Sequence, residues 1–429
     1  MNAQIISQND SEVTIQVKIL LRPSMLESEQ SILECVNEVG TLATEVALKQ
    51  FDADGEPIII GDVKLTSRCQ SGKNYQTPYG VAYINRFVYQ TSKGGKVYIP
   101  LESGARIIQG ATPRFAKILS HKYSNLSAPG VIEDLSENHN RKVAHSYLQN
   151  VTHYVGGIAQ AKEKSWSYET PELNKPVNSL GISLDGAYIP TVNDGYREGM
   201  VGTIAYYDKK GERLHTTYIA ASPEYGKEIF FERFEREIRR EKERYPSAEA
   251  IGVADGAKDN WSFLEKHTSK QILDFWHAAE YLSEASHAVF PRKNDNDERE
   301  QWLEQQCHDL KHKRGAATRI LNKLKGCTVK RLSKTTKEKL TAAITYFKNN
   351  INAGRMKYYR HTENNLPIGS GVIEAACKTI IKQRLSASGM RWKSNGIKIV
   401  LSLRALIKTK GRWDQFWEKI NISGVPVMA

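Results

Sequence analysis

The sequence predicts an α/β protein with a mixed core of strands and helices, flanked by segments that are mainly helical. Two observations predict this class. Over residues 181–289, short apolar runs with strand character alternate with stretches of helical periodicity. Next to that stretch on either side, over residues 113–155 and 291–409, apolar residues recur mostly at helical spacing. The 429 residues are 40% hydrophobic and 25% charged, which excludes a mainly disordered or collagen-like chain.

The order of elements in the core can be followed along the chain. Strand patterns come first, then helices and strands in alternation. The expected elements are strands at 181–189, 199–208 and 213–221, a helix at 226–245, a strand at 250–257, a helix from KDNW, a strand QILDF and a helix at 276–289. The resulting order β-β-β-α-β-α-β-α is that of a ribonuclease H-like core.

The first 110 residues predict a small α+β region. A strand pattern at 12–20 precedes a helical spacing over 24–50, and short strands are expected at 58–64 and 81–100 with a turn at Gly94 and Gly95. The helix could pack internally or pair with a second subunit. We therefore leave open whether this region serves dimerisation or the binding of DNA ends.

Residues 113–155 predict three short helices with a polar joint, ENHN, between the second and the third. Such a pair of helices fits a helix-turn-helix. The last helix carries side chains that read DNA grooves, namely Arg141, Lys142, His145, Ser146, Gln149 and Asn150. A plain three-helix core with one polar face is the alternative.

The remaining segments complete the predicted organisation. Residues 162–178 are polar with two prolines and predict a linker, and residues 291–365 are polar, basic and helical in pattern. The predicted regions are an α+β region (1–110), a helix-turn-helix region (111–161), a linker (162–178), the first part of the core (179–290), an all-helical insertion (291–365), the completion of the core (366–410) and a tail (411–429).

The positive charge is concentrated in the last third of the chain. Residues 301–429 hold 26 Lys and Arg against 7 Asp and Glu, whereas residues 1–300 hold 35 against 41. The whole chain has a formal net charge of +13. A basic block of this size favours a polyanion such as nucleic acid as partner. The alternative is a basic helical region without a partner.

The cysteines and the N-terminus bear on compartment and metal. Five scattered cysteines lack the short spacings of zinc or redox motifs, so we predict no zinc site and no disulfides. The first residues show no basic start followed by an apolar run, and no stretch approaches 18 apolar residues. We expect a cytoplasmic protein with no membrane contact.

Two aspartates are expected at the ends of buried strands. Asp185 lies in SLDG and Asp255 in VADG, and each is followed by a glycine that lets the backbone turn. Hard divalent cations prefer oxygen ligands held on a rigid frame, and strand ends provide one. A single D-G pair is weak because it is also a common turn, but two in one core predict a metal site.

Glu374 is the third candidate carboxylate. It lies in PIGSGVIEAACKTIIKQRL, where Ser370 could cap the helix start, and it shares a helix face with Lys378 and Lys382 at four-residue steps. That face suits a metal ion beside a phosphate backbone. The alternative is a ladder of salt bridges on a solvent-facing helix.

Three carboxylates can hold two Mg²⁺ ions about 4 Å apart, and such pairs cut and join phosphodiesters. We therefore predict that Asp185, Asp255 and Glu374 are catalytic metal ligands for Mg²⁺, with Mn²⁺ as a substitute. Asp194, Asp208 and Asp259 lie in predicted turns or helix starts and are expected at the surface, and Glu280 lies in a predicted helix without strand-end geometry.

Two further clusters are candidates for contacts near the site. Asp274 and His277, in DFWH, stand at a strand-to-helix junction and could position groups or contact DNA. Arg391, Trp392 and Lys393 place an aromatic ring between two cations, which suits a stacked base or a clamped phosphate. The alternatives are a structural histidine and a tryptophan buried at a helix end.

These blocks resemble the ISKra-type insertion-sequence transposases, a bacterial DDE transposase family. The resemblance spans roughly residues 113–410 and is carried by DGA at Asp185, ADGAKDNW at Asp255, DFWHAAEYL at Asp274 and, most specifically, PIGSGVIEAACKTIIKQRLSASGMRW around Glu374. It implies a ribonuclease H-like domain with an all-helical insertion between Asp255 and Glu374, and it implies a D-x-x-H feature formed by Asp274 and His277. Many relatives carry a cysteine cluster that is reduced here to Cys69.

The expected function is that of a DDE transposase. It would bind the inverted-repeat ends of its own element, cut DNA with Mg²⁺ and join the 3′-hydroxyls to target DNA. We expect double-stranded DNA as partner, a homodimer or larger assembly on that DNA, and a nucleoid-associated location. Two alternatives stay open: a ribonuclease H-like nuclease or resolvase that cuts without joining, and a non-enzymatic, domesticated DNA-binding protein.

Overall fold

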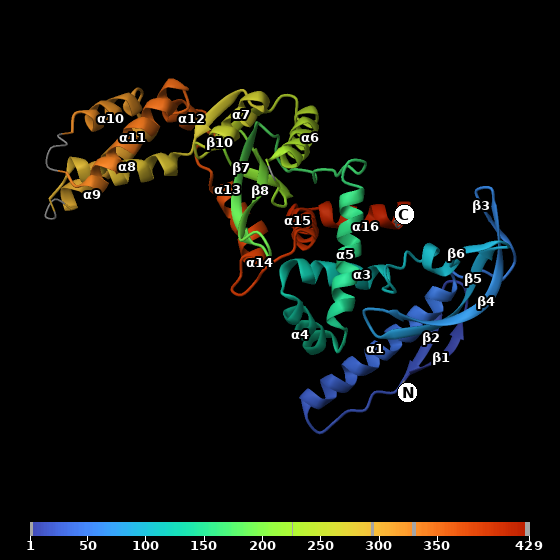
Figure 1. Cartoon of the computed structure of the whole chain (residues 1–429). Helices are drawn as coiled ribbons and strands as arrows, with labels where there is room; N and C mark the ends of the chain where they lie inside the picture. The colour runs from blue at the N-terminus through green and yellow to red at the C-terminus, as the bar shows by residue number, and fades with distance from the viewer. Residues whose placement is uncertain (1–2, 225, 293–295, 328–331, 425–429) are drawn as a thin grey trace. The chain divides into compact units, whose positions relative to one another are not determined.

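The computed structural model describes residues 3–224, 226–292, 296–327 and 332–424 (Figure 1). The few positions between and beyond these ranges fall within the predicted regions 1–110, 179–290, 291–365 and 411–429 and lie outside the described residues. The chain divides into two compact units. The first comprises residues 1–169, 398–407 and 411–429, and the second residues 170–397 and 408–410. The division after residue 169 falls within the segment predicted to be a linker.

The N-terminal part of the first unit is α+β, as its sequence pattern predicts. Helix α1 (Met25–Lys49) matches the predicted helix, and the hydroxyl of Ser24 caps it by accepting a hydrogen bond from the Glu27 amide. Strand β2 (Val13–Val17) pairs antiparallel with β1 (Ala3–Gln8), which the sequence did not predict. Alternation is hard to detect in a strand that is almost wholly exposed, as β1 is.

A four-stranded antiparallel sheet follows, in the order β3-β4-β5-β6. Its strands are β3 (Ile58–Ile60), β4 (Val63–Gln76), β5 (Val81–Thr91) and β6 (Gly94–Tyr98). Strand β4 continues well beyond the predicted 58–64 because its polar second half pairs with β5 over a long ladder. Its buried Tyr75 lies opposite Ala82 and joins a small core with Leu48 of α1 and Leu101 of α2 (Pro100–Gly104).

Three helices complete the predicted tri-helical segment: α3 (Pro113–Asn125), α4 (Ala128–His139) and α5 (His145–Ala161). Asn140 ends α4 in the left-handed conformation, with φ 49°, so the ENHN joint is a helix end. The C-terminal part of α15 (Ser394–Lys408) packs closely on α5, where a Cβ on Gly156 would lie 2.6 Å from Ile399. The predicted tail contains a further helix, α16 (Arg412–Ser423).

The second unit contains a five-stranded mixed sheet in the order β11-β10-β7-β8-β9. Its strands are β7 (Ser179–Pro190), β8 (Tyr196–Tyr207), β9 (Arg213–Ala221), β10 (Glu249–Ala254) and β11 (Lys270–Leu273). Strands β7, β8 and β9 are antiparallel neighbours, and β10 and β11 run parallel to β7. All five predicted strands are therefore present, and each short apolar run forms a buried strand as expected.

Helices cover both faces of this sheet. Phe234 of α6 (Glu228–Arg244) would lie 3.0 Å from a Cβ on Gly202 of β8, and Ile381 would lie 3.4 Å from a Cβ on Gly199. These two glycines are three residues apart and thus point to opposite faces. Helix α6 and the segment around Ile381 therefore pack on opposite sides of the sheet, and α7 (Lys258–His267) connects β10 to β11.

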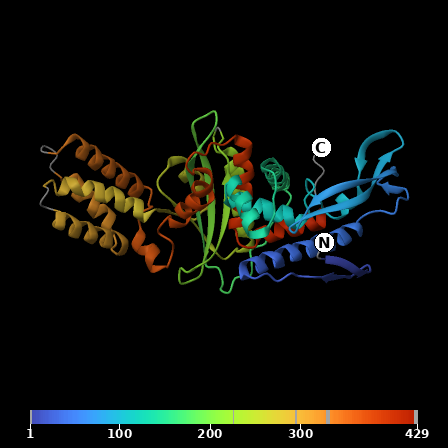
Figure 2. The same ribbon diagram turned by 90° about the horizontal axis from the view of Figure 1, so that it is seen from below.

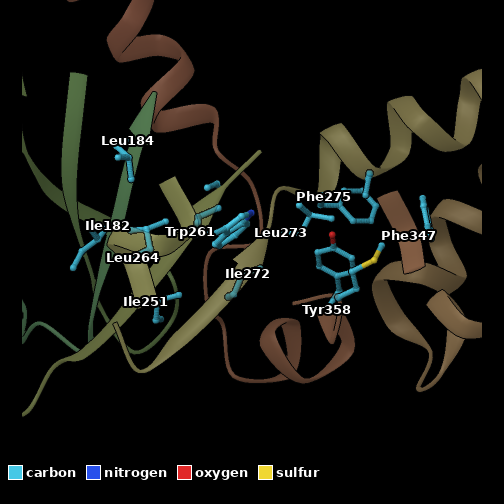
Figure 3. Close-up of a cluster of buried hydrophobic side chains, with 14 of the residues drawn as sticks. Ile182, Leu184, Ile251, Trp261, Leu264, Ile272, Leu273, Phe275, Phe347 and Tyr358 are labelled. Carbon is cyan, nitrogen blue, oxygen red and sulfur yellow. The ribbon is translucent and has the colours of Figure 1, made fainter. Parts of the chain in front are cut away.

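Five helices extend from the end of β11 to residue 363: α8 (Phe275–Val289), α9 (Asn296–His312), α10 (Ala316–Lys325), α11 (Lys334–Asn352) and α12 (Tyr358–Glu363). Four of them, α8 to α11, lie side by side in both views (Figures 1 and 2). Their apolar core is continuous with that of the sheet. In Figure 3 the side chains of Phe275, Phe347 and Tyr358 lie next to those of Ile272 and Leu273 of β11. The rings of Phe275 and Tyr358 are packed edge to face, with their centroids 5.4 Å apart.

The helix that carries Glu374 changes its winding along its length. It begins as α13 (Gly371–Ala376), continues as a π-helical turn, η3 (Cys377–Lys382), and ends as α14 (Gln383–Leu385). The predicted apolar stripe of this helix is buried, from Ile373 to Ile381. The predicted face shared by Glu374, Lys378 and Lys382 assumed α-helical turns throughout, and the wider π turn alters that spacing.

Candidate metal centre

Three aspartates are associated with three adjacent parallel strands: Asp185 lies within β7, Asp255 directly follows β10, and Asp274 directly follows β11. The register pairs Gly252 of β10 with Ile182 of β7, and Ala254 of β10 with Leu273 of β11. Continuing each register toward the carboxyl ends places Asp255 opposite Asp185 on one side and opposite Asp274 on the other. The amide of Asp274 donates to the Ala254 carbonyl at 2.9 Å, in keeping with this alignment. We refer to these three aspartates, which the continued register aligns, as the acidic row.

Asp185 lies in the middle of its strand and not at its end. Strand β7 runs on to Pro190, and Asp185 lies opposite Val201 of β8. Gly186 is therefore part of the strand, and its missing side chain leaves room for Glu198, whose carboxyl group a Cβ would overlap. The prediction that glycine ends the strand here is wrong, because the antiparallel partner β8 extends the ladder past the point where parallel β10 stops.

The environment of Asp185 disfavours a bare negative charge. Burial raises the pKa of Asp185, and the nearby charges of Asp255 and Glu198 raise it further. Its carboxylate accepts hydrogen bonds from the Gly186 amide at 2.7 Å and from the Cys377 thiol at 3.7 Å. Burial and Asp185 itself raise the pKa of Cys377, so the thiol keeps its proton and acts as a donor. A cation between Asp185 and Asp255 would relieve this repulsion.

Asp255 lies at the end of its strand, as predicted. Gly256 adopts φ 123°, a conformation open to glycine, and the chain turns into α7. Tyr346 of α11 supports the turn, because its hydroxyl donates to the Asp255 carbonyl at 2.5 Å. Burial and the charge of Asp255 raise the pKa of Tyr346, so this hydroxyl stays protonated.

Asp274 and Glu374 are joined by one serine. Asp274 is fully buried, and it accepts the Trp276 amide at 2.7 Å as the N-cap of α8. The Ser370 hydroxyl contacts the other oxygen of Asp274 and also lies 2.7 Å from a Glu374 oxygen. Ser370 therefore links two acids and makes no side-chain cap at α13, contrary to the prediction. A hydroxyl has one proton, so it cannot satisfy both carboxylates at once, and a shared cation or proton would complete the arrangement.

His277 completes this group. Ligand atoms of Asp274, His277 and Glu374 all lie within 4.8 Å of one another, so the three side chains could hold a metal ion. Burial of the ring opposes its charged form, but Asp274, Glu280 and Asp255 outweigh burial and raise the pKa of His277. Glu280 lies 3.1 Å from Nδ1 of His277, and a carboxylate in this position orients a ligating imidazole.

Of the predicted site residues, the structure brings Asp274, His277 and Glu374 close together, and this group does not include Asp185 or Asp255. Asp274 and His277, predicted as positioning residues, stand with Glu374 in the one metal-ligating group of three found among the described residues. Asp255 lies close enough for its charge to raise the pKa of both Asp185 and His277. Sequence reasoning missed Ser370 as the link, Glu280 as the partner of His277 and Tyr346 as the support of Asp255. The i,i+3 spacing of His277 and Glu280 could have indicated the second of these.

The predicted DNA contacts of the helix-turn-helix region divide into exposed and buried positions. Lys142 and His145 are exposed, and Gln149 is half-buried. Arg141 is only 7% exposed, and its guanidinium donates to the Thr77 and Gly80 carbonyls and to the Gln76 side chain. We therefore assign Arg141 to the packing of the first unit rather than to DNA.

Replacement of Arg141 by methionine should destabilise the first unit by about 3 kcal/mol, because three buried acceptors would lose a charged donor. Urea denaturation followed by far-UV circular dichroism would measure this. Its exposed neighbour provides the matched control, since Lys142→Met should stay within about 0.5 kcal/mol of wild type. Equal stability of the two variants would contradict the structural role of Arg141.

The second group of predicted DNA contacts lies beyond the Glu374 helix. Lys378, Lys382, Arg391 and Lys393 are exposed. Trp392 is half-buried, with the guanidinium of Arg384 4.7 Å from its ring, and its amide donates to the Pro190 carbonyl at 3.0 Å. Trp392 thus anchors the loop to the end of β7, which agrees with the structural alternative, and it holds Arg391 and Lys393 at the surface.

Comparisons with known proteins add no assignment. No protein-family model matches the chain, and no curated protein matches it. Within the part of the chain that the structure describes, no helix is both long and apolar enough to cross a membrane.

Proposed function

We propose that this protein is a DDE transposase, which cuts DNA at the ends of its own element with divalent metal ions and joins the 3′-hydroxyls to target DNA. The observation that carries the proposal is the acidic row of Asp185, Asp255 and Asp274 with Glu374 and His277 beside it. The sheet has the strand order β11-β10-β7-β8-β9, and the first three of its strands along the chain, β7 to β9, are antiparallel neighbours. This arrangement supports a ribonuclease H-like core. The helices α8 to α12 between Asp255 and Glu374 support the insertion.

The donor set fits divalent metals. Asp185 with Asp255 would supply one set of carboxylate oxygens, and Asp274, Glu374 and His277 would supply another. Bound Mg²⁺ or Mn²⁺ would activate a water or a 3′-hydroxyl and stabilise the leaving oxygen. Oxygen ligands suit Mg²⁺, and the imidazole of His277 makes Mn²⁺ an equally good occupant. Burial fixes the orientation of the Asp274 side chain, and the hydrogen bond to Glu280 fixes that of the His277 ring.

The charge distribution supports double-stranded DNA as the partner. The exposed Lys378, Lys382, Arg391 and Lys393 follow Glu374 in the basic last third of the chain. Phosphate contacts of this kind make affinity fall steeply with salt. Because two element ends are cut and joined together, we propose a homodimer or larger assembly on DNA in a bacterial cytoplasm.

A strand-transfer assay tests the proposal. The full-length protein would be incubated with duplex oligonucleotides that carry the inverted repeats flanking its gene, together with a supercoiled target plasmid. We expect nicked ends and joined products with Mg²⁺ or Mn²⁺, and none with EDTA. Cleavage without joined products would favour a nuclease or resolvase. Specific binding without any cleavage would favour a non-enzymatic DNA-binding protein.

A further inference from the structure

An exposed tryptophan stands beside the candidate metal centre. Trp276 is 64% exposed, although in the sequence it stands between Asp274 and His277, two members of the candidate metal-binding group. Tryptophan is among the residues with the most apolar surface to bury, so the exposure of its indole beside this group is costly. Neither the fold nor the metal ligands require an indole at this position.

Trp276 is held in place on the side that faces the protein. Its amide donates to Asp274, and the edge of its indole lies against Gly369, where a Cβ would be 3.2 Å from both Cδ1 and Nε1. Phe275 meets the ring edge-on at 5.5 Å. The glycine thus leaves space for the indole, and the ring is supported while much of its surface faces solvent.

The other exposed aromatic residues of this unit lie elsewhere. Among its described residues, Tyr188 and Tyr196 are the remaining exposed aromatics. Tyr188 follows Asp185 by three positions in β7, so its side chain points to the face of the sheet opposite to that of Asp185. Tyr196 lies opposite Pro190 and shares the face of Tyr188. Among the described residues of this unit, Trp276 is therefore the one exposed aromatic that adjoins the candidate metal-binding group.

We infer that Trp276 is a stacking site for an unpaired nucleobase next to the scissile phosphate. The inference rests on the proposed function, because a phosphodiester held at the metal centre brings its flanking bases to the indole. Every base has a π-face that can stack on tryptophan, so such a site tolerates any sequence. A base in a duplex is already covered on both faces and must leave the stack to reach the ring.

The inference is tested by binding and by cleavage. 2-Aminopurine at the terminal nucleotides of an element-end duplex reports unstacking by its fluorescence. We expect wild-type protein, in Ca²⁺ to prevent turnover, to change that fluorescence and Trp276→Ala to leave it as in free DNA. With Mg²⁺, Trp276→Ala should slow single-turnover cleavage of paired duplex about 5- to 150-fold, which corresponds to about 1–3 kcal/mol per stacked base. Trp276→Phe should retain most of the rate.

A mismatch beside the cleavage point supplies the unpaired base in advance, so it should restore much of the lost rate to Trp276→Ala. Tyr188→Ala is the matched control, because Tyr188 is also 64% exposed but points to the face of the sheet opposite to Asp185. It should show no mismatch-dependent recovery. Mn²⁺ affinity should be the same in wild type and in Trp276→Ala, which separates stacking from damage to the metal ligands.

The possible failures are distinguishable. If wild-type protein cleaves DNA but Trp276→Ala gives the same fluorescence change and rate, only the stacking role is wrong. A loss in Trp276→Ala that is equal on paired and mismatched DNA also overturns it, as does a loss in Trp276→Phe as large as in alanine. If no metal supports cleavage but the fluorescence change still depends on Trp276, the stacking site stands and the proposed reaction fails.

Discussion

Asparagine in place of Asp255 should reduce DNA cleavage by about 10³-fold or more. The substitution keeps the shape of the side chain and removes one negative charge from the centre of the acidic row. Bound metal contributes several kcal/mol of transition-state stabilisation, and each 1.36 kcal/mol is tenfold in rate. Asp185→Asn should have a similar effect, because Asp185 lies close enough to Asp255 for the charge of Asp255 to raise its pKa. Single-turnover cleavage of element-end DNA would measure both.

Binding and a neutral substitution separate chemistry from folding. Affinity for the same DNA, measured by fluorescence anisotropy in Ca²⁺, should not fall in either variant, because removing a carboxylate near phosphates reduces repulsion. Asp259→Asn is the matched control: Asp259 is exposed four residues after Asp255, in the first turn of α7, and its charge faces solvent. Cleavage by Asp255→Asn at the rate of the Asp259→Asn control would remove Asp255 from the site.

Glutamine in place of Glu374 should weaken metal binding at the group formed with Asp274 and His277, and it should reduce DNA cleavage as strongly as Asp255→Asn does. Glu374 combines with Asp274 and His277 in the one close group of three metal-ligating side chains among the described residues. Asp274→Asn should match it, since both acids share the Ser370 hydroxyl. Mn²⁺ titration by calorimetry should show at least about a tenfold loss of affinity, the scale seen when even an outer partner of a metal site is removed.

The same experiment decides which acids form the centre. An exposed glutamate on α12, Glu363, supplies the control, and Glu363→Gln should bind Mn²⁺ as wild type does. If Asp274→Asn cleaves normally while Asp255→Asn does not, Asp274 is a structural cap of α8 and the metal ligands are Asp185, Asp255 and Glu374 alone. If both variants fail, the row of three aspartates acts as one site.

The apolar periodicity determined most of the elements. The buried strand β10 is predicted close to its observed position because burial on both faces leaves a continuous apolar run. Helices such as α1 and α5 were found because one face repeats at helical spacing. Strand β1 was missed because it is almost wholly exposed, and the polar half of β4 was missed because its pairing with β5 defines it.

The roles of single residues were harder to predict from the sequence than the helices and strands were. The D-G pair at Asp255 was interpreted correctly, since Gly256 adopts a conformation open to glycine. The same pair at Asp185 was misread, because a partner strand distant in sequence prolongs β7. Arg141 has the residue type of a DNA contact, yet the carbonyls that bury it come from residues more than sixty positions earlier in the chain.

The sequence by itself determined which carboxylates are placed on buried, rigid elements, because apolar strands and an apolar helix stripe must turn inward wherever they fold. Only the tertiary structure decided how those carboxylates are grouped. The pairing of β10 with β7 and β11, continued toward the carboxyl ends, aligns Asp185, Asp255 and Asp274, and the packing of the Glu374 helix brings Ser370 between two of the acids. Register and helix packing depend on contacts between residues far apart in the chain, and local periodicity contains no information about them.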